Sequence, residues 1–211
     1  LEDILYELRD KGHVQALVKY TPNINLHPHL NELKKRNIGL YLAKQNSCTH
    51  HMPIDCDEFY IKYQLDYAIN TIVKENLDAA ACRLATYYKE PIYRLSPDED
   101  YWVTLPFKLN PEIQFKNSSN FPALVDPTRQ VDANSFKFFN KNEIQMHHMS
   151  YVRKDMAKKI VNSSAFSDTK DGLQEIYKKY KEWSYPDKAL CCVPLREFDI
   201  IKVDNIFNIE I

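Results

Sequence analysis

Apolar residues along this chain follow two alternating patterns, one with helical spacing and one with short extended runs. Apolar positions three and four residues apart predict amphipathic helices, which cover residues 1–11, 28–46, 61–76, 152–162 and 170–183. On the third of these helices, the residues expected to face the core are Leu65, Ile69, Ile72 and Val73. Runs rich in apolar, aromatic and β-branched residues predict strands, which cover residues 14–20, 49–54, 79–88, 101–105, 121–125, 135–139, 189–193 and 198–203, and a further run that ends at His147 and His148.

The order of these elements predicts an α/β fold. Up to about residue 89, predicted strands and helices alternate, which is typical of a sheet with parallel neighbours covered by helices. Residues 90–144 differ, since they hold more than half of the eleven prolines and contain short strands and long loops. Because neither a low-complexity linker nor an internal repeat separates the two parts, we expect a single domain over residues 1–211, with halves at 1–89 and 90–211.

Charge and hydropathy argue against two classes of protein. The 28 Lys and Arg residues are balanced by 29 Asp and Glu residues, so the chain lacks the basic excess of proteins that bind phosphate backbones. No uninterrupted apolar run reaches the roughly 20 residues needed to cross a bilayer. We therefore expect a soluble protein with no transmembrane segment and no nucleic acid as its main ligand.

The glycine and cysteine content narrows the chemistry further. The three glycines, Gly12, Gly39 and Gly172, lie too far apart for a dinucleotide fingerprint, a P-loop or a nucleophile elbow. A bound phosphate must therefore be held by other groups. The five cysteines contain no C-x-x-C pair, and their odd number favours reduced thiols over a disulfide framework. We accordingly expect a cytoplasmic protein.

An acidic cluster follows the predicted strand 49–54. Asp55 and Asp57 are two residues apart, with Glu58 next to them, and α/β sheets place their ligand sites at such strand ends. Two carboxylates at this spacing can bind one hard cation, and Mn²⁺ or Mg²⁺ is the expected ion. The alternative is a solvated acidic turn, because so short a pattern is common by chance.

Two pairs of adjacent histidines are further candidates. His147 and His148 end a predicted strand just before a helix, where a neutral imidazole can complete a metal site begun by carboxylates. The alternative is a hydrogen-bonded structural histidine. His50 and His51 lie within a predicted strand and therefore point to opposite faces, so we expect them in the core or behind the metal ligands.

Basic side chains can hold a diphosphate without a glycine loop. The predicted helix 28–46 carries Lys35 and Arg36, and Arg129 and Arg153 follow later in the chain. Of these four, Lys35, Arg36 and Arg153 are the expected donor-binding residues. The alternative for such charges is a solvated helix face.

Three segments, taken in order, carry a resemblance to a known family. They are Lys35-Arg-Asn-Ile-Gly-Leu40, the run from Cys48 to Tyr60 that contains Asp55-Cys-Asp57, and His147-His-Met-Ser-Tyr-Val-Arg153. Together they resemble the centre of a nucleotide-sugar glycosyltransferase of the GT-A fold, in the broad family 2-like group. The resemblance covers roughly residues 1–165 and extends, less closely, to glycosyltransferases encoded by large DNA viruses of algae. It implies a Rossmann-like mixed sheet flanked by helices.

The resemblance also implies roles for individual residues. Asp57 would bind the metal directly, while Asp55 would contact the donor ribose or the water shell of the metal. His148 would be the third protein ligand, with His147 as the alternative. Because a protonated imidazole cannot ligate, metal affinity is expected to fall as the pH drops through about 6.5. The strand and the acidic motif that bind nucleobase and ribose in the family would precede Leu1, so we expect a chain without the first strands of the fold.

The activity implied by the resemblance is metal-dependent glycosyl transfer. A hexose or deoxyhexose would move from a nucleoside-diphosphate sugar to a glycan or glycoprotein acceptor, with inversion at the anomeric carbon. The ion would neutralise charge on the leaving diphosphate, and a carboxylate would accept the proton of the acceptor hydroxyl. The first candidate for this base is Asp126, in a Pro-flanked loop between predicted strands, and the second is Asp155, one helical turn after the histidines.

Two other classes of function fit the same residues. A divalent-metal hydrolase of phosphoesters or sugar nucleotides would also use paired carboxylates and histidines. A carbohydrate-binding protein without catalysis would keep the fold but not the reaction. Incubation with sugar nucleotides and Mn²⁺, with and without acceptors, separates transfer, hydrolysis and binding.

Overall fold

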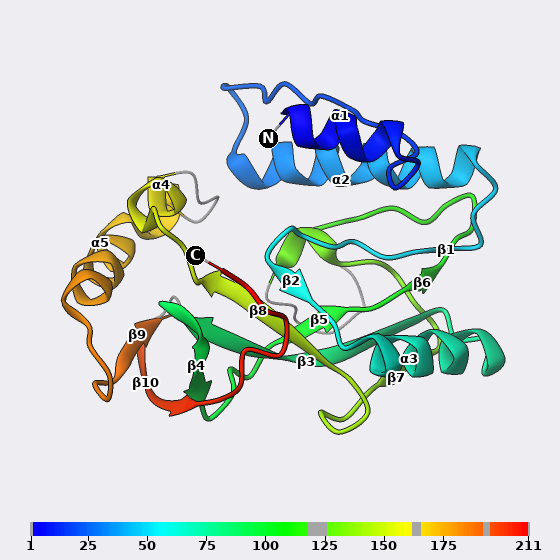
Figure 1. The fold of residues 1–211 in the computed structure, drawn as a ribbon. Coiled ribbons are helices and arrows are strands. Elements are labelled where there is room, and N and C mark those ends of the chain that lie inside the picture. The colour runs from blue at the N-terminus through cyan, green and yellow to red at the C-terminus, as the bar shows by residue number, and fades with distance from the viewer. Residues whose placement is uncertain (1, 118–125, 162–165, 192–194, 211) are drawn as a thin grey trace.

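The computed structural model describes residues 2–117, 126–161, 166–191 and 195–210 (Figure 1). Its helices are α1 (Glu2–Asp10), α2 (Pro28–Gln45), α3 (Lys62–Lys74), α4 (Met156–Val161) and α5 (Phe166–Glu182), and a 3₁₀ turn, η1, covers Pro127–Arg129. Its strands are β1 (His50–His51), β2 (Glu58–Phe59), β3 (Ala79–Tyr88), β4 (Glu90–Ser96), β5 (Trp102–Thr104), β6 (Phe107–Lys108), β7 (Phe136–Phe138), β8 (Gln145–Tyr151), β9 (Ala189–Cys191) and β10 (Arg196–Lys202). Helices flank a mixed sheet in one α/β domain. Among the described helices, none is both long and apolar enough to cross a membrane.

β3 is the central strand of the eight-stranded main sheet. The strand order is β2-β8-β3-β4-β10-β9, and β5 and β7 also pair with β3. β3 runs parallel to β7 and β8 and antiparallel to β4 and β5. Nine of its ten residues are buried, which its nearly continuous apolar sequence favours in a strand covered on both faces. β3 thus anchors the strands on either side of it.

Helices pack on the sheet in three apolar clusters (Figure 1). α2 contributes Leu40 to a cluster that includes the first residues of β3. α3 contributes Ala68 and Ile72 to a second cluster, which contains Leu84 of β3. α4 and α5 close a third cluster around Tyr88 at the other end of the same strand. β2, the strand next to the acidic turn, lies below α2 in this view and pairs with β8.

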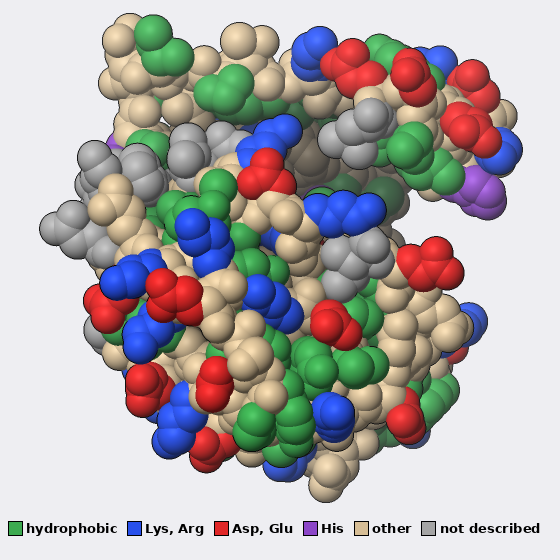
Figure 2. Space-filling view, turned by 60° about the vertical axis from the view of Figure 1, so that its left-hand side comes forward, with side chains coloured by type: hydrophobic (Ala, Val, Ile, Leu, Met, Phe, Trp, Pro, Cys, Tyr) green, Lys and Arg blue, Asp and Glu red, His purple; other side chains and the backbone are tan. Residues whose placement is uncertain are grey.

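The molecular surface is hollowed beneath the two N-terminal helices. Figure 2 shows α1 and α2 above the body of the molecule, with both basic and acidic side chains at the edge of the hollow. The hollow therefore has a charged border of both signs.

Most of the predicted elements are confirmed. All five predicted helices are present, although α4 begins at Met156 instead of residue 152 and α5 begins at Phe166 instead of residue 170. The predicted strands at 79–88, 101–105, 135–139, 189–193 and 198–203 correspond to β3, β5, β7, β9 and β10, and the histidine-bearing run corresponds to β8. The run 121–125 lies outside the described residues.

Three predictions from the apolar pattern are wrong. Residues 14–20 form no strand, and they are exposed or only half-buried. The strand predicted at 49–54 is reduced to β1, which pairs with β6 outside the main sheet. On α3, Ile69 and Val73 are 37% and 56% exposed, because Ala68 and Ile72 take the buried face.

Candidate functional site

The acidic turn lies beside the histidine-bearing strand. β2 pairs with β8 in an antiparallel register that sets Glu58 opposite His148 and Phe59 opposite His147. The turn before β2 is fixed by its backbone, since the amide of Met149 donates to the Asp57 carbonyl at 2.8 Å. The structure therefore brings together two sequence segments that are about ninety residues apart.

Asp57, His148 and Arg153 form the centre of the site. The Nε2 atom of His148 lies 4.0 Å from Oδ2 of Asp57, and both side chains are 19% exposed. A guanidinium nitrogen of Arg153 donates a hydrogen bond to the same Oδ2 atom. A carboxylate, an imidazole and a guanidinium group thus lie close together, partly buried, beside β8.

His147 lies on the other face of β8. Adjacent residues of a strand point to opposite faces, and a hydrogen bond of 2.9 Å joins Nδ1 of His147 to the hydroxyl of Tyr87. The ring also contacts Phe207 edge to face, with centroids 5.0 Å apart. This placement matches a hydrogen-bonded structural histidine, and it leaves His148 as the imidazole that faces Asp57.

Both imidazoles are held in the neutral form. Burial lowers the pKa of His148 from 6.5 to about 4, with Asp57 opposing the shift and Lys159 adding to it. Burial likewise lowers the pKa of His147 to about 4, with a contribution from Arg94. His148 is therefore ready to ligate at neutral pH, and its protonation sets in well below the pH of about 6.5 expected from the sequence.

Acidification is expected to destabilise the fold through His147. The pKa of His147 is about 4 in the folded protein and about 6.5 in the unfolded chain. The free energy of unfolding is therefore at its full value above pH 6.5, and it falls as the pH drops toward 4, because only the unfolded chain takes up the proton. One pKa unit corresponds to about 1.4 kcal/mol, so the free energy of unfolding should drop by about 3 kcal/mol over this interval. Urea unfolding of the parent and of His147→Gln between pH 7 and pH 4.5 measures the effect. Equal losses in the two proteins would contradict it.

Arg129 binds the other two carboxylates of the acidic turn. Its side chain is 2% exposed. Nη1 donates to Oε2 of Glu58 at 3.0 Å, while Nη2 donates to Oε1 of Glu58 and to Oδ2 of Asp55, both at 2.5 Å. Burial raises the pKa of Glu58, and Arg129 opposes this shift. The resulting ion cluster ties the turn to η1.

Arg36 of α2 joins the same cluster from above. Its Nη2 atom lies 2.7 Å from Oδ2 of Asp126 and 3.4 Å from Oδ2 of Asp55, and its Nε atom donates to the Thr128 hydroxyl at 3.0 Å. Burial alone would raise the pKa of Asp55, but the charges and hydrogen bonds of Arg129 and Arg36 lower it overall. Asp55 is therefore an ionised carboxylate held between two guanidinium groups.

The remaining predicted site residues have other surroundings. Asp126 caps η1, where its Oδ1 atom accepts hydrogen bonds from the amide and the hydroxyl of Thr128 at 2.8 and 2.6 Å. Asp155 is exposed, and its carboxylate accepts from the amide of Lys158 at 2.9 Å. Lys35 is exposed and pairs with Glu32 at 2.7 Å, which matches a solvated helix face. The contacts found for Asp155 and Lys35 within the described part of the chain do not include Asp57.

Two groups at the site carry no signal in the sequence. Lys159 of α4 donates to the carbonyl and the hydroxyl of Ser150. Burial lowers its pKa to about 8, and the charge of Arg153 adds to this shift. On the neighbouring strand, Thr86 pairs in register with His148 and donates to the buried carboxylate of Glu99. The one hint in the sequence is that Ser150 and His148 are two residues apart on β8 and therefore lie on the same face of the strand.

The donor set fits a metal ion only in part. Among the described residues, no group of three or more His, Cys, Asp or Glu side chains is placed to hold a metal ion. The carboxylate of Asp57 and the neutral imidazole of His148 are 4.0 Å apart, and they are the two side chains that would hold an ion here. Mg²⁺-type ions are commonly held by one or two protein groups together with substrate phosphates. The pair therefore fits an ion that a phosphate ligand helps to hold.

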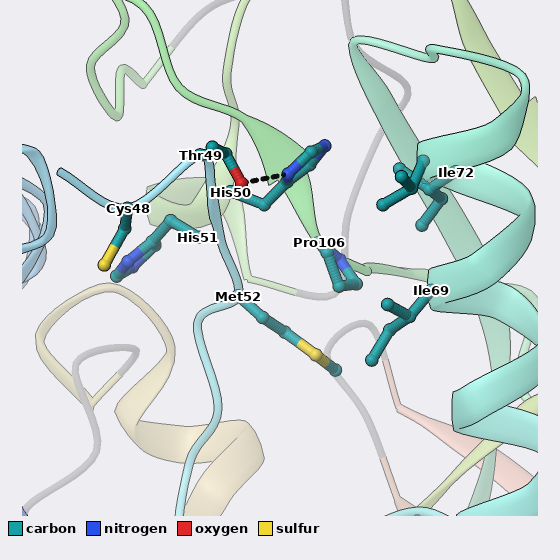
Figure 3. Close-up of a pocket in the computed structure, with 9 residues that line it drawn as sticks. Cys48, Thr49, His50, His51, Met52, Ile69, Ile72 and Pro106 are labelled. Carbon is teal, nitrogen blue, oxygen red and sulfur yellow. Dashed lines mark hydrogen bonds between the residues drawn. The ribbon is translucent and has the colours of Figure 1, made fainter.

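A separate cavity of about 480 Å³ lies between β1 and α3 (Figure 3). The rings of His50 and His51 point in different directions from the chain, and Nδ1 of His50 lies 3.0 Å from the hydroxyl of Thr49. Ile69, Ile72 and Val73 form the wall on the side of α3. Burial lowers the pKa values of both histidines, so they are neutral lining residues of an apolar cavity.

Comparison with known protein families, with curated proteins and with solved structures found no match to this chain. The description of the site therefore rests on its geometry.

Proposed function

We propose that the chain is a metal-dependent glycosyltransferase of the GT-A type, which uses a nucleoside-diphosphate sugar as donor and a glycan or glycoprotein as acceptor. The single observation that supports this proposal most is the approach of Asp57 to His148 within 4.0 Å across the β2–β8 pair. The D-x-D resemblance requires a histidine from far along the chain at this place. A solvated acidic turn has no such requirement.

The chain's own residues have complementary tasks in this proposal. Bound Mn²⁺ or Mg²⁺ would supply a positive charge for the leaving diphosphate. Asp57 and His148 would hold the ion, while Arg153 and Lys159 place two further cations beside it. Arginine and lysine bind phosphate oxygens through charge-assisted hydrogen bonds. A diphosphate can thus be bound here without a glycine-rich loop.

The carboxylates at the site differ in how free they are to act as the base. Asp126 is neutralised by Arg36, whereas Asp155 is solvent-exposed at the start of α4. A general base must reach the proton that it accepts. Asp126→Asn and Asp155→Asn, assayed for transfer, are the direct comparison of the two candidates within this proposal.

The deciding experiment measures donor turnover. The chain is incubated with Mn²⁺ and a panel of UDP- and GDP-sugars, with and without glycan acceptors, and released nucleoside diphosphate is quantified. Release that depends on the acceptor supports a transferase. Release without an acceptor supports a sugar-nucleotide hydrolase, and glycan binding without any release supports a carbohydrate-binding protein.

His148→Ala is expected to weaken Mn²⁺ binding by at least about tenfold, because even groups behind the metal ligands contribute factors of about 10–100. Nucleoside diphosphate binding should weaken with it. His147→Ala is the matched control, since it removes the same ring from the opposite face of β8. Calorimetric titration of both folded variants is the measurement. Unchanged affinity in His148→Ala, or equal losses in the two variants, would exclude His148 as a ligand.

A further inference from the structure

The guanidinium group of Arg153 binds the carboxylate that the proposed metal ion would use. One of its nitrogens donates to Oδ2 of Asp57, the same atom that lies 4.0 Å from Nε2 of His148. A divalent ion held by Asp57 and His148 would approach the same carboxylate. The guanidinium and the ion are both cations, so they compete for Asp57.

Arg153 is anchored in a way that lets its tip leave Asp57. Its Nε atom donates to the Ser150 carbonyl at 2.9 Å, and its own carbonyl accepts from the Tyr180 hydroxyl at 3.2 Å. The side chain is nevertheless 35% exposed. The backbone and the Nε atom are therefore held in place, while the side chain as a whole stays partly open to solvent, from which a ligand arrives.

A second cation stands next to Arg153. Lys159 is hydrogen-bonded to Ser150, whose carbonyl also accepts from Arg153. Two cations on one carbonyl form a place where an anion with several oxygens is attracted. A diphosphate that binds here gives the guanidinium a new partner and frees the carboxylate of Asp57.

We propose that Arg153 is an internal competitor for the metal ion, and that the donor diphosphate releases it. In the free protein Arg153 neutralises Asp57 and weakens metal binding. When the diphosphate accepts the guanidinium, Asp57 becomes available, so metal and nucleotide each strengthen the binding of the other. By linkage, the factor is the same in both directions. This inference rests on the proposed function, because it takes Asp57 as a metal ligand.

The test compares Mn²⁺ affinities of the full chain and Arg153→Met, measured by electron paramagnetic resonance of the free ion. UDP and GDP are added in separate titrations, and protein-free titrations account for their own Mn²⁺ binding. The parent should bind Mn²⁺ weakly alone and more tightly with nucleotide, by a factor in the usual coupling range of about 5–150. Arg153→Met should bind Mn²⁺ alone about tenfold more tightly than the parent. Its affinity should respond to nucleotide more weakly than that of the parent, because only the direct contact between the ion and the phosphates remains.

Two further variants sharpen the comparison. Arg94→Met removes an arginine that is paired with Asp98 outside the site, and it should leave Mn²⁺ affinity and coupling as in the parent. Arg153→Lys keeps the charge on a shorter side chain, so its Mn²⁺ affinity should fall between those of the parent and Arg153→Met.

The failure of this inference differs from the failure of the proposed function. If the parent binds Mn²⁺ and Arg153→Met binds it equally or less tightly, or responds to nucleotide as strongly as the parent, Arg153 is no competitor, while the metal site stands. If neither protein binds Mn²⁺ with or without nucleotide, the metal site is wrong and the inference falls with it.

Discussion

Asp57→Asn is expected to slow transfer by about 1000-fold and to lower Mn²⁺ affinity by at least about 100-fold. The substitution keeps the size of the side chain but removes the negative charge that a hard divalent ion requires. It also removes one of the two protein groups that are close enough to share an ion, the other being His148. Since loss of a single stabilising group in an active site typically costs about 100- to 1000-fold in rate, transfer should fall by about 1000-fold.

Asp98→Asn is the matched control for this variant. Asp98 pairs with Arg94 as Asp57 pairs with Arg153, and its side chain is 20% exposed, against 19% for Asp57. Mn²⁺ titration and acceptor-dependent release of nucleoside diphosphate are measured on both variants. If Asp57→Asn binds Mn²⁺ and turns over like the parent, Asp57 is no metal ligand and belongs only to an acidic turn.

The helices and strands that could be predicted from the sequence are those in which the order of apolar and polar residues already indicates which faces are buried. The segment 79–88, which is apolar except for Arg83 and Thr86, forms β3, as a mostly apolar strand is typical of a sheet covered on both faces. β4 was not predicted as a strand. It begins at the exposed Glu90 and several of its later residues are only half-buried, so its sequence shows no continuous apolar run. The turn into β4 is formed by Lys89 with a φ of 62°, a conformation that usually signals glycine or asparagine. Residues 14–20 show the opposite error, a predicted strand that does not form. An apolar run becomes a strand only where another strand pairs with it, and these residues have no such pairing with any described strand.

The residues of the site could be predicted by type but not by partnership. Alternation along β8 required one histidine on each face, and only the pairing of β2 with β8 shows that His148 is the one beside Asp57. From the sequence, Arg36 was expected to bind the donor, and Arg129 was named as a further basic side chain able to hold a diphosphate. In the structure both bind carboxylates of the acidic turn and of η1 instead. These contacts join residues up to about ninety positions apart, and no local spacing encodes them.

Arg129→Met is expected to be the most destabilising single substitution near the site. Removing one partner of a buried ion pair leaves an uncompensated charge and costs about 3–5 kcal/mol. Glu58 would lose both of its hydrogen bonds from Arg129, and its side chain is only 3% exposed. At about 2–4 °C per kcal/mol for a chain of this size, the melting temperature should fall by about 10 °C. Thermal and urea unfolding measure the loss.

Two comparisons separate an uncompensated charge from a simple loss of packing. The double variant Arg129→Met with Glu58→Gln should lose less stability than the sum of the two single variants, because it no longer buries an unpaired carboxylate. The pH should matter as well. Burial already raises the pKa of Glu58, and without Arg129 it should rise further. Stability that depends on a protonated Glu58 is present at low pH and is lost as the pH rises. The loss in free energy of unfolding of Arg129→Met relative to the parent should therefore become smaller on acidification. A packing defect would instead give a loss that does not change with pH, and the losses of the two single variants would add up in the double variant.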